Sequence, residues 1–196
     1  IKNKLEPDKV TSSYGASDFV QAVAMGDTDT ASAARDEIIA THVDNGKSQE
    51  EAEKAFASAV KSSTNEAYSA GLLDRAEAEN MLIEYADKDE EEATSKVSYW
   101  AFCKEHPEHK DVFNEANVAK FYEFAEPAEV PVDVYAQFIT GTKGLGDIKD
   151  EWGDVEVSKR EQVLEVIDSL PLTWQQKDAL YLAYGYKEST MWDVPW

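Results

Sequence analysis

Cysteine is almost absent from this sequence, with Cys103 as the single example among 196 residues. One thiol cannot form a disulfide bond within the chain, which excludes a small extracellular fold stapled by disulfides. A nucleophilic thiol needs a base beside it, and the nearby His106 and His109 are separated from each other by Pro107. We therefore predict that Cys103 packs as a small apolar side chain.

Basic residues are scarce relative to acidic ones: 19 Lys and Arg face 40 Asp and Glu, which gives a formal net charge of −21. Nucleic-acid binding requires clusters of Lys and Arg that neutralise phosphates, so we expect no direct contact with nucleic acid. The excess of carboxylates fits a soluble surface, recognition of a basic partner, or mimicry of a polyanion.

Long apolar runs are also missing, so we expect no membrane span, and no signal peptide is visible. The sequence starts at Ile1 rather than Met. We interpret it as a fragment, a processed product or part of something longer, with the final aromatic residues as a natural ending. With 42% apolar and 11% aromatic residues, the chain can build one domain or two small ones.

Signals for helix starts are frequent in the sequence. A capping box pairs Ser, Thr or Asp with Glu or Gln three residues later, and it satisfies two main-chain N–H groups of the first turn. Such pairs are Ser48–Glu51, Asp74–Glu77, Ser158–Glu161 and Thr173–Gln176. Alternation of apolar and polar residues with period two never lasts. We therefore predict an all-α fold whose short helices form consecutive hairpins.

Two packed helical subdomains are predicted. Residues 1–16 form an arm or linker, 17–106 the N-terminal subdomain and 113–196 the C-terminal subdomain. In the first, Ser17 is expected to cap a short helix that ends near Gly26. Gly71 is expected to end a long helix, and Leu72 and Leu73 to pin the turn that follows it.

The C-terminal subdomain is predicted to end in a helical hairpin, 158–196, with helices over 158–169 and 173–184 after a Gly- and Asp-rich loop at 141–157. Its predicted core consists of Phe121, Tyr122, Tyr135, Phe138, Ile167, Leu170, Leu180 and Tyr181. The apolar tail contains the candidate partner-binding residues Trp192, Pro195 and Trp196. This tail either closes the hairpin on Tyr181 and Tyr184, which we expect, or inserts into a neighbouring subunit.

Three segments contain side chains that bind metals elsewhere. Residues 106–109 lack the i, i+4 histidine pair of zinc proteases, so we interpret them as a loop. The carboxylates of residues 87–92 are interpreted as the start of a helix, where they match the positive end of the helix dipole. The third segment weakly resembles a calcium loop, with Asp150, Asp154 and Glu161 at its first, fifth and twelfth positions. Most other ligands of such a loop are missing, so neither a metal nor a cofactor is predicted.

Several stretches form a recognisable pattern. They are FYEFAEP (121–127), VPVDVY (130–135), LPLT (170–173), QKDALY (176–181), GYKEST (185–190) and the final Pro195-Trp196. They resemble the C-terminal helical regions of large structural proteins encoded by tailed bacteriophages of gut Firmicutes. The resemblance covers 113–196 well and 17–104 more loosely, where AGLLDRAEA (70–78) and Tyr99-Trp100 are similar.

This resemblance implies a non-enzymatic role in the virion, with other phage virion proteins as partners. The location it implies is the virion, or the bacterial host cytoplasm during assembly. A minor head protein, an internal ejected protein and the end of a tail tape measure all fit. The Asp-rich loop before the final hairpin is often a better calcium-like loop in that family, and the family has no catalytic residues to carry over.

Two other functions compete with this one. An acidic mimic of DNA that inhibits a host nuclease, of the anti-restriction or anti-CRISPR type, fits the charge and the small size. Such a mimic needs carboxylates in ordered rows, whereas a structural module scatters them. An enzyme fits least, because none of the three histidines has an evident partner in the sequence. The oligomeric state is left open.

Overall fold

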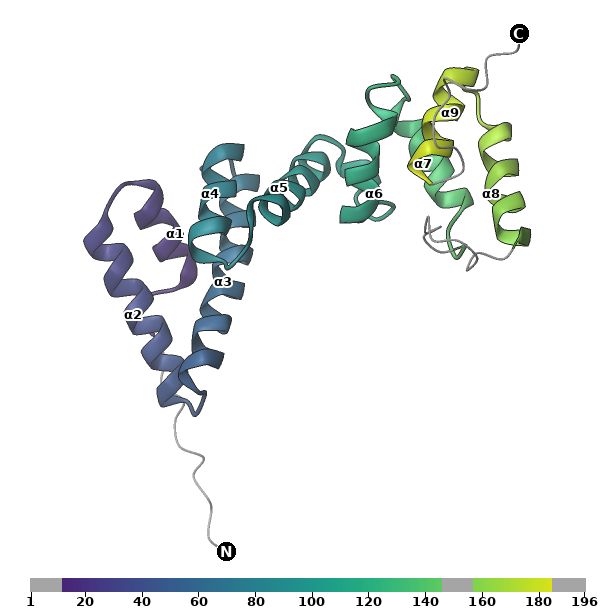
Figure 1. Cartoon of the computed structure of the whole chain (residues 1–196). Helices are drawn as coiled ribbons and strands as arrows, with labels where there is room; N and C mark the ends of the chain where they lie inside the picture. The colour runs from purple at the N-terminus through teal and green to yellow at the C-terminus, as the bar shows by residue number, and fades with distance from the viewer. Residues whose placement is uncertain (1–11, 146–156, 185–196) are drawn as a thin grey trace, which may run out of the picture. The chain divides into compact units, whose positions relative to one another are not determined.

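The computed structural model describes residues 12–145 and 157–184, and every regular element in these ranges is a helix (Figure 1). Nine α-helices, one 3₁₀ helix and one π-helix follow each other there without a strand, which confirms the predicted all-α class. No helix in the described ranges is long and apolar enough to cross a membrane. The chain divides into two compact units, Ile1–Ala101 and Phe102–Trp196.

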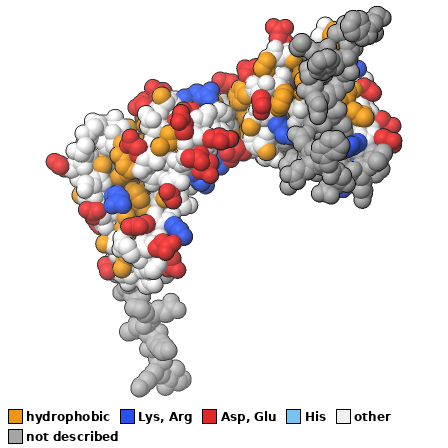
Figure 2. Space-filling model, in the orientation of Figure 1, with side chains coloured by type: hydrophobic (Ala, Val, Ile, Leu, Met, Phe, Trp, Pro, Cys, Tyr) orange, Lys and Arg blue, Asp and Glu red, His pale blue; other side chains and the backbone are white. Residues whose placement is uncertain are grey.

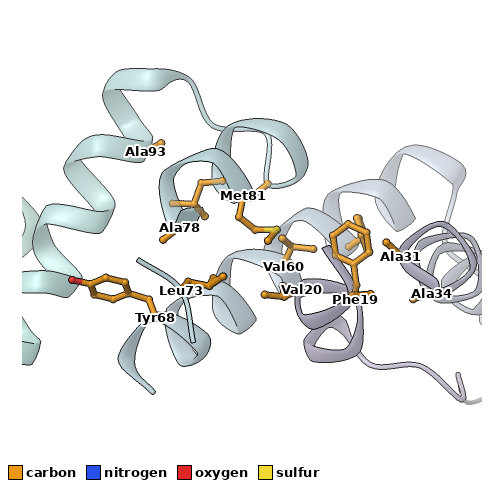
Figure 3. Packing of buried hydrophobic residues seen from close by; sticks show 14 of the residues in the cluster. Phe19, Val20, Ala31, Ala34, Val60, Tyr68, Leu73, Ala78, Met81 and Ala93 are labelled. Atoms are coloured by element: carbon orange, nitrogen blue, oxygen red, sulfur yellow. The ribbon is translucent and has the colours of Figure 1, made fainter. Parts of the chain in front are cut away.

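The first unit is built on three helices that contact each other pairwise. Its elements are α1 (Ala16–Ala24), α2 (Thr28–Asp44), α3 (Gln49–Ser69), α4 (Arg75–Tyr85) and most of α5 (Glu90–Glu105). Helix α4 packs on α3. Phe19 and Val20 of α1 lie beside Val60 of α3 in the core (Figure 3). The Phe19 ring meets Phe56 and Tyr85 edge-on, each with 5.0 Å between ring centroids.

Side-chain caps begin helices α2 to α5 of this unit, as the sequence predicts. Ser48 and Glu51 form the capping box of α3, and Asp74 and Glu77 that of α4. At α5, the Asp89 carboxylate accepts a hydrogen bond from the Glu92 main-chain N–H at 2.7 Å. Residues 87–92 therefore provide a helix start, because their carboxylates satisfy N–H groups that the helix leaves free.

Three local predictions are wrong. Helix α1 starts at Ala16 with Gly15 as its N-cap rather than Ser17, because the Asp18 carboxylate accepts a hydrogen bond from the Gly15 N–H at 2.8 Å. The predicted arm thus overlaps α1 by one residue. Helix α8 (Val157–Ser169) already includes Ser158, its expected cap. Gly71 ends α3 with a φ of 81°, as predicted, but only Leu73 is buried and Leu72 is 63% exposed.

The second unit continues with smaller elements around an aromatic core. They are η1 (Pro107–His109), α6 (Glu115–Lys120), η2 (Phe121–Ala125), α7 (Val132–Gly141), α8 and α9 (Trp174–Ala183). Element η2 is a π-helix, in which the Glu126 N–H donates to the Phe121 carbonyl five residues back at 2.8 Å. It continues α6 up to Glu126 and Pro127, where the sequence predicts the helix end.

Most of the predicted core of this unit is buried. The buried members are Phe121, Tyr135, Phe138, Ile167, Leu170 and Leu180. Tyr122 and Tyr181 are half-buried instead, since their rings lie at the edge of the core. Two further rings complete the core: Phe102 and Phe113 pack edge-on at 4.7 Å between centroids. The sequence pattern does not identify these two, because Phe102 lies near the end of α5 and Phe113 lies between helices.

Candidate functional site

One histidine and two carboxylates come together in the second unit. The His109 Nε2 atom lies 2.7 Å from Asp133 Oδ1 and 3.9 Å from Glu108 Oε1. The three ligand atoms all lie within 4.8 Å of one another. The expectation that residues 106–109 form a loop and that no histidine has a partner is therefore wrong. Residues 107–109 form η1, and Asp133 reaches His109 from 24 positions further along the chain.

The local sequence places the histidine. Pro107 is the first residue of η1, where its fixed φ suits the tight helix. His109 is the last residue of η1, and its side chain is only 17% exposed. Its ring packs edge-on against Phe113 with 6.0 Å between centroids. The imidazole is thus held in one orientation, with Nε2 directed at Asp133.

The same aromatic core also positions Asp133. Phe113 stacks on Tyr135 with 5.5 Å between centroids and 6° between planes. Tyr135 is fully buried on α7, two residues after Asp133, and its hydroxyl donates to the Asn117 carbonyl at 2.9 Å. Burial raises the pKa of Tyr135, so the phenol stays neutral and acts as a donor. One stacked pair of rings therefore links the positions of His109 and Asp133.

The cluster can act as a cation site or as a hydrogen-bonded clamp. A neutral imidazole carries one N–H, so Nε2 either donates to Asp133 or offers a lone pair. Nearby in the same unit is a hollow of about 420 Å³ whose lining includes Asp111, Lys143 and Tyr184. Glu108, His109 and Asp133 are not among its lining residues. The cluster thus lies outside that hollow.

The two helices of the predicted final hairpin, α8 and α9, are present and contact each other. Thr173 and Gln176 make the capping box of α9. The hydroxyl of Tyr181 donates to Asp168 Oδ1 at 2.6 Å across the hairpin, and Lys177 Nζ donates to the Asp168 carbonyl at 2.9 Å. Burial and the hydrogen bond to Asp168 raise the pKa of Tyr181 to about 12. Tyr184 is buried and packs edge-on against Phe138 at 5.0 Å between ring centroids.

Several residues singled out in the sequence fall outside the described ranges. They are Asp150, Asp154, Trp192, Pro195 and Trp196. Glu161, the twelfth position of the calcium-like loop, is exposed on α8. Cys103 is half-buried on α5. Of the residues predicted as sites, the described ranges contain only Glu161, so the calcium-like loop and the partner-binding tail stay predictions.

The first unit has one apolar surface of interest. Met25 is 78% exposed and Leu72 63% exposed, and both line a hollow of about 550 Å³. Val20 of α1 and Leu73 form part of its floor. The sequence did not indicate this surface because both leucines were expected to pin the turn, whereas Leu72 is exposed and Leu73 is buried.

Comparison of the chain with models of protein families, with curated proteins and with solved structures gave no match in any of the three.

Proposed function

We propose that this chain is a non-enzymatic structural or assembly module of a tailed-phage particle, acting through contacts with other virion proteins. The main support for the proposal combines the sequence resemblance with the packing of the helices. Two of the stretches that resemble phage structural proteins, FYEFAEP (121–127) and QKDALY (176–181), lie on η2 and α9, which pack on each other. The side chain of Gln176 also donates to the Glu129 carbonyl at 2.9 Å. The resemblance thus falls on one packed body.

The distribution of charge supports a module over a mimic of DNA. The first 101 residues contain 21 Asp and Glu and 10 Lys and Arg, and the remaining 95 contain 19 and 9. Acidic and basic side chains are interspersed on the visible face of the described residues (Figure 2). A mimic concentrates carboxylates in rows at phosphate spacing on one face.

Many of the carboxylates also have partners inside the chain. Asp27 accepts a hydrogen bond from Thr30 N–H at 3.1 Å, and Glu37 accepts one from Ser13 N–H at 2.7 Å. Hydrogen bonds from the side chains of Thr30 and Ser13, together with those from their N–H groups, lower the pKa of both carboxyl groups. Glu51, Glu77 and Glu92 close capping boxes in the same way. Hydrogen bonds inside the chain, most of them at helix N-termini, therefore explain part of the acidity without a basic partner.

The test is mass spectrometry of purified particles of the phage that encodes the chain. We expect peptides of this chain in a fixed ratio to the major capsid protein. As a matched comparison, a particle that carries Met25→Ser and Leu72→Ser should contain less of the chain, because protein partners cover exposed apolar side chains. Absence of the chain from mature particles and from assembly intermediates would contradict the proposal.

The second candidate is an inhibitor of a host nuclease, favoured by the net charge of −21. It predicts that the purified chain inhibits a restriction or CRISPR nuclease in competition with DNA and that salt weakens the inhibition. Nuclease inhibition together with absence from particles would replace the first proposal with this one.

A further inference from the structure

We propose that Glu108, His109 and Asp133 form a binding site for one Zn²⁺ ion, with a water molecule at the fourth position. Nothing in the amino-acid spacing indicates this site, because its ligands come from η1 and from the first turn of α7. The inference rests on the cluster of three ligand atoms and on the rings that hold it.

The distances suit a zinc ion. Zinc binds imidazole nitrogen and carboxylate oxygen at about 2.0–2.2 Å, which places neighbouring ligand atoms of a tetrahedral site about 3.4 Å apart. The His109–Asp133 distance of 2.7 Å lies below this value and the His109–Glu108 distance of 3.9 Å lies above it. Small side-chain rotations of the exposed Glu108 and Asp133 bring both to the required spacing.

The ligand types select among metals. An imidazole nitrogen with two carboxylates suits zinc and other divalent transition metals, whereas Ca²⁺ and Mg²⁺ take oxygen ligands. The His106 Nδ1 atom lies 3.8 Å from Glu108 Oε1, so a second imidazole borders the cluster. Two carboxylates neutralise the charge of a divalent ion, so its binding leaves no net charge at the site.

Zinc takes the place of the proton that joins His109 to Asp133. In the metal-free pair Nε2 and Oδ1 lie at hydrogen-bond distance, and because a carboxylate only accepts, this bond requires the hydrogen on Nε2. When zinc binds Nε2, the single proton of a neutral imidazole moves from Nε2 to Nδ1, and a doubly protonated imidazole releases its Nε2 proton to solvent. The ion then links η1 to α7 across 24 positions of sequence, which stabilises the folded second unit by linkage.

Isothermal titration of the full chain with ZnCl₂ tests the site, after removal of any histidine tag and dialysis against EDTA. We expect one equivalent to bind at micromolar zinc and to raise the melting temperature. Loss of a partner outside the ligand shell already lowers metal affinity by about 10–100-fold. His109→Gln and Asp133→Asn should therefore each weaken binding at least tenfold.

The matched control is His42→Gln, which alters the one histidine of α2 in the first unit and should leave zinc affinity unchanged. The Asp133 side chain is 83% exposed, so Asp133→Asn should keep the fold, as circular dichroism can verify. Nitrogen chemical shifts of the His109 ring should move on zinc addition in the wild type. Equal zinc binding by wild type and both ligand variants, or no saturable binding below 100 µM, would show that the cluster is only a hydrogen-bonded clamp.

Discussion

Lys120 at the end of α6 donates from Nζ to the main-chain oxygen of Ala183 at 2.9 Å, across 63 positions of sequence. The same ammonium lies 4.4 Å from the centroid of the Tyr184 ring. A carbonyl at a helix C-terminus lacks its intrahelical partner and carries the negative end of the helix dipole. The lysine therefore caps α9 and joins it to the helix that continues into η2.

We expect Lys120→Met to destabilise the second unit, because it keeps the aliphatic stem and removes the charged donor. Hydrogen bonds to charged groups contribute about 1.5–3 kcal/mol, and a half-buried donor such as Lys120 should fall at the lower end. Urea unfolding followed by circular dichroism gives the change. Lys110→Met, at an exposed lysine of the same unit, is the control and should have little effect. Equal stability of the two variants would show that the cap at Ala183 contributes nothing.

Leu180→Ala should destabilise the chain by about 2–5 kcal/mol, because the leucine side chain is fully buried and its loss leaves a cavity. Leu72→Ala is the matched control, since the same atoms are removed from a side chain that is 63% exposed. Urea unfolding measures both. A loss below about 0.5 kcal/mol at Leu180 would mean that the site collapses around the smaller residue.

The chain should bind duplex DNA negligibly at physiological salt, because carboxylates outnumber basic residues in both units. An electrophoretic shift assay or fluorescence anisotropy with a labelled duplex can check this. Micromolar binding to plain duplex DNA would overturn the expectation.

Local signals predicted much of the fold. The caps at Ser48, Asp74 and Thr173 are each decided by residues within one turn of helix, so the sequence alone locates them. The start of α1 was missed because Asp18 pairs with Gly15, a residue without a capping side chain. Local reasoning succeeds where both partners of a hydrogen bond lie three residues apart and both belong to recognised capping types.

The candidate site could not be predicted, because its residues are far apart in the sequence. His109 and Asp133 are 24 positions apart, and they meet because Phe113 stacks on Tyr135. The π-helix at 121–125 likewise depends on packing, since nothing in the local pattern separates it from an ordinary last turn. Contacts of this kind follow from tertiary structure, which local patterns in a single sequence do not reveal.

The hydroxyl of Tyr181 provides a prediction for alkaline pH. Burial and its hydrogen bond to Asp168 raise its pKa from 10.0 to about 12. Because the folded pKa lies above the unfolded one, the contribution of this phenol to stability is complete below pH 10. It is lost as the pH rises toward 12, since the unfolded chain releases the proton first.

We therefore expect the stability difference between wild type and Tyr181→Phe to be greatest near neutral pH and to shrink above pH 10. Urea unfolding at several pH values measures this difference, and ultraviolet titration of the two proteins isolates the phenolate of Tyr181. Asp168→Asn is a second variant: it removes the charge that opposes ionisation and should bring the pKa of Tyr181 closer to 10. A wild-type protein whose Tyr181 titrates near 10 would show that the hydroxyl does not hold α9 to α8 in solution.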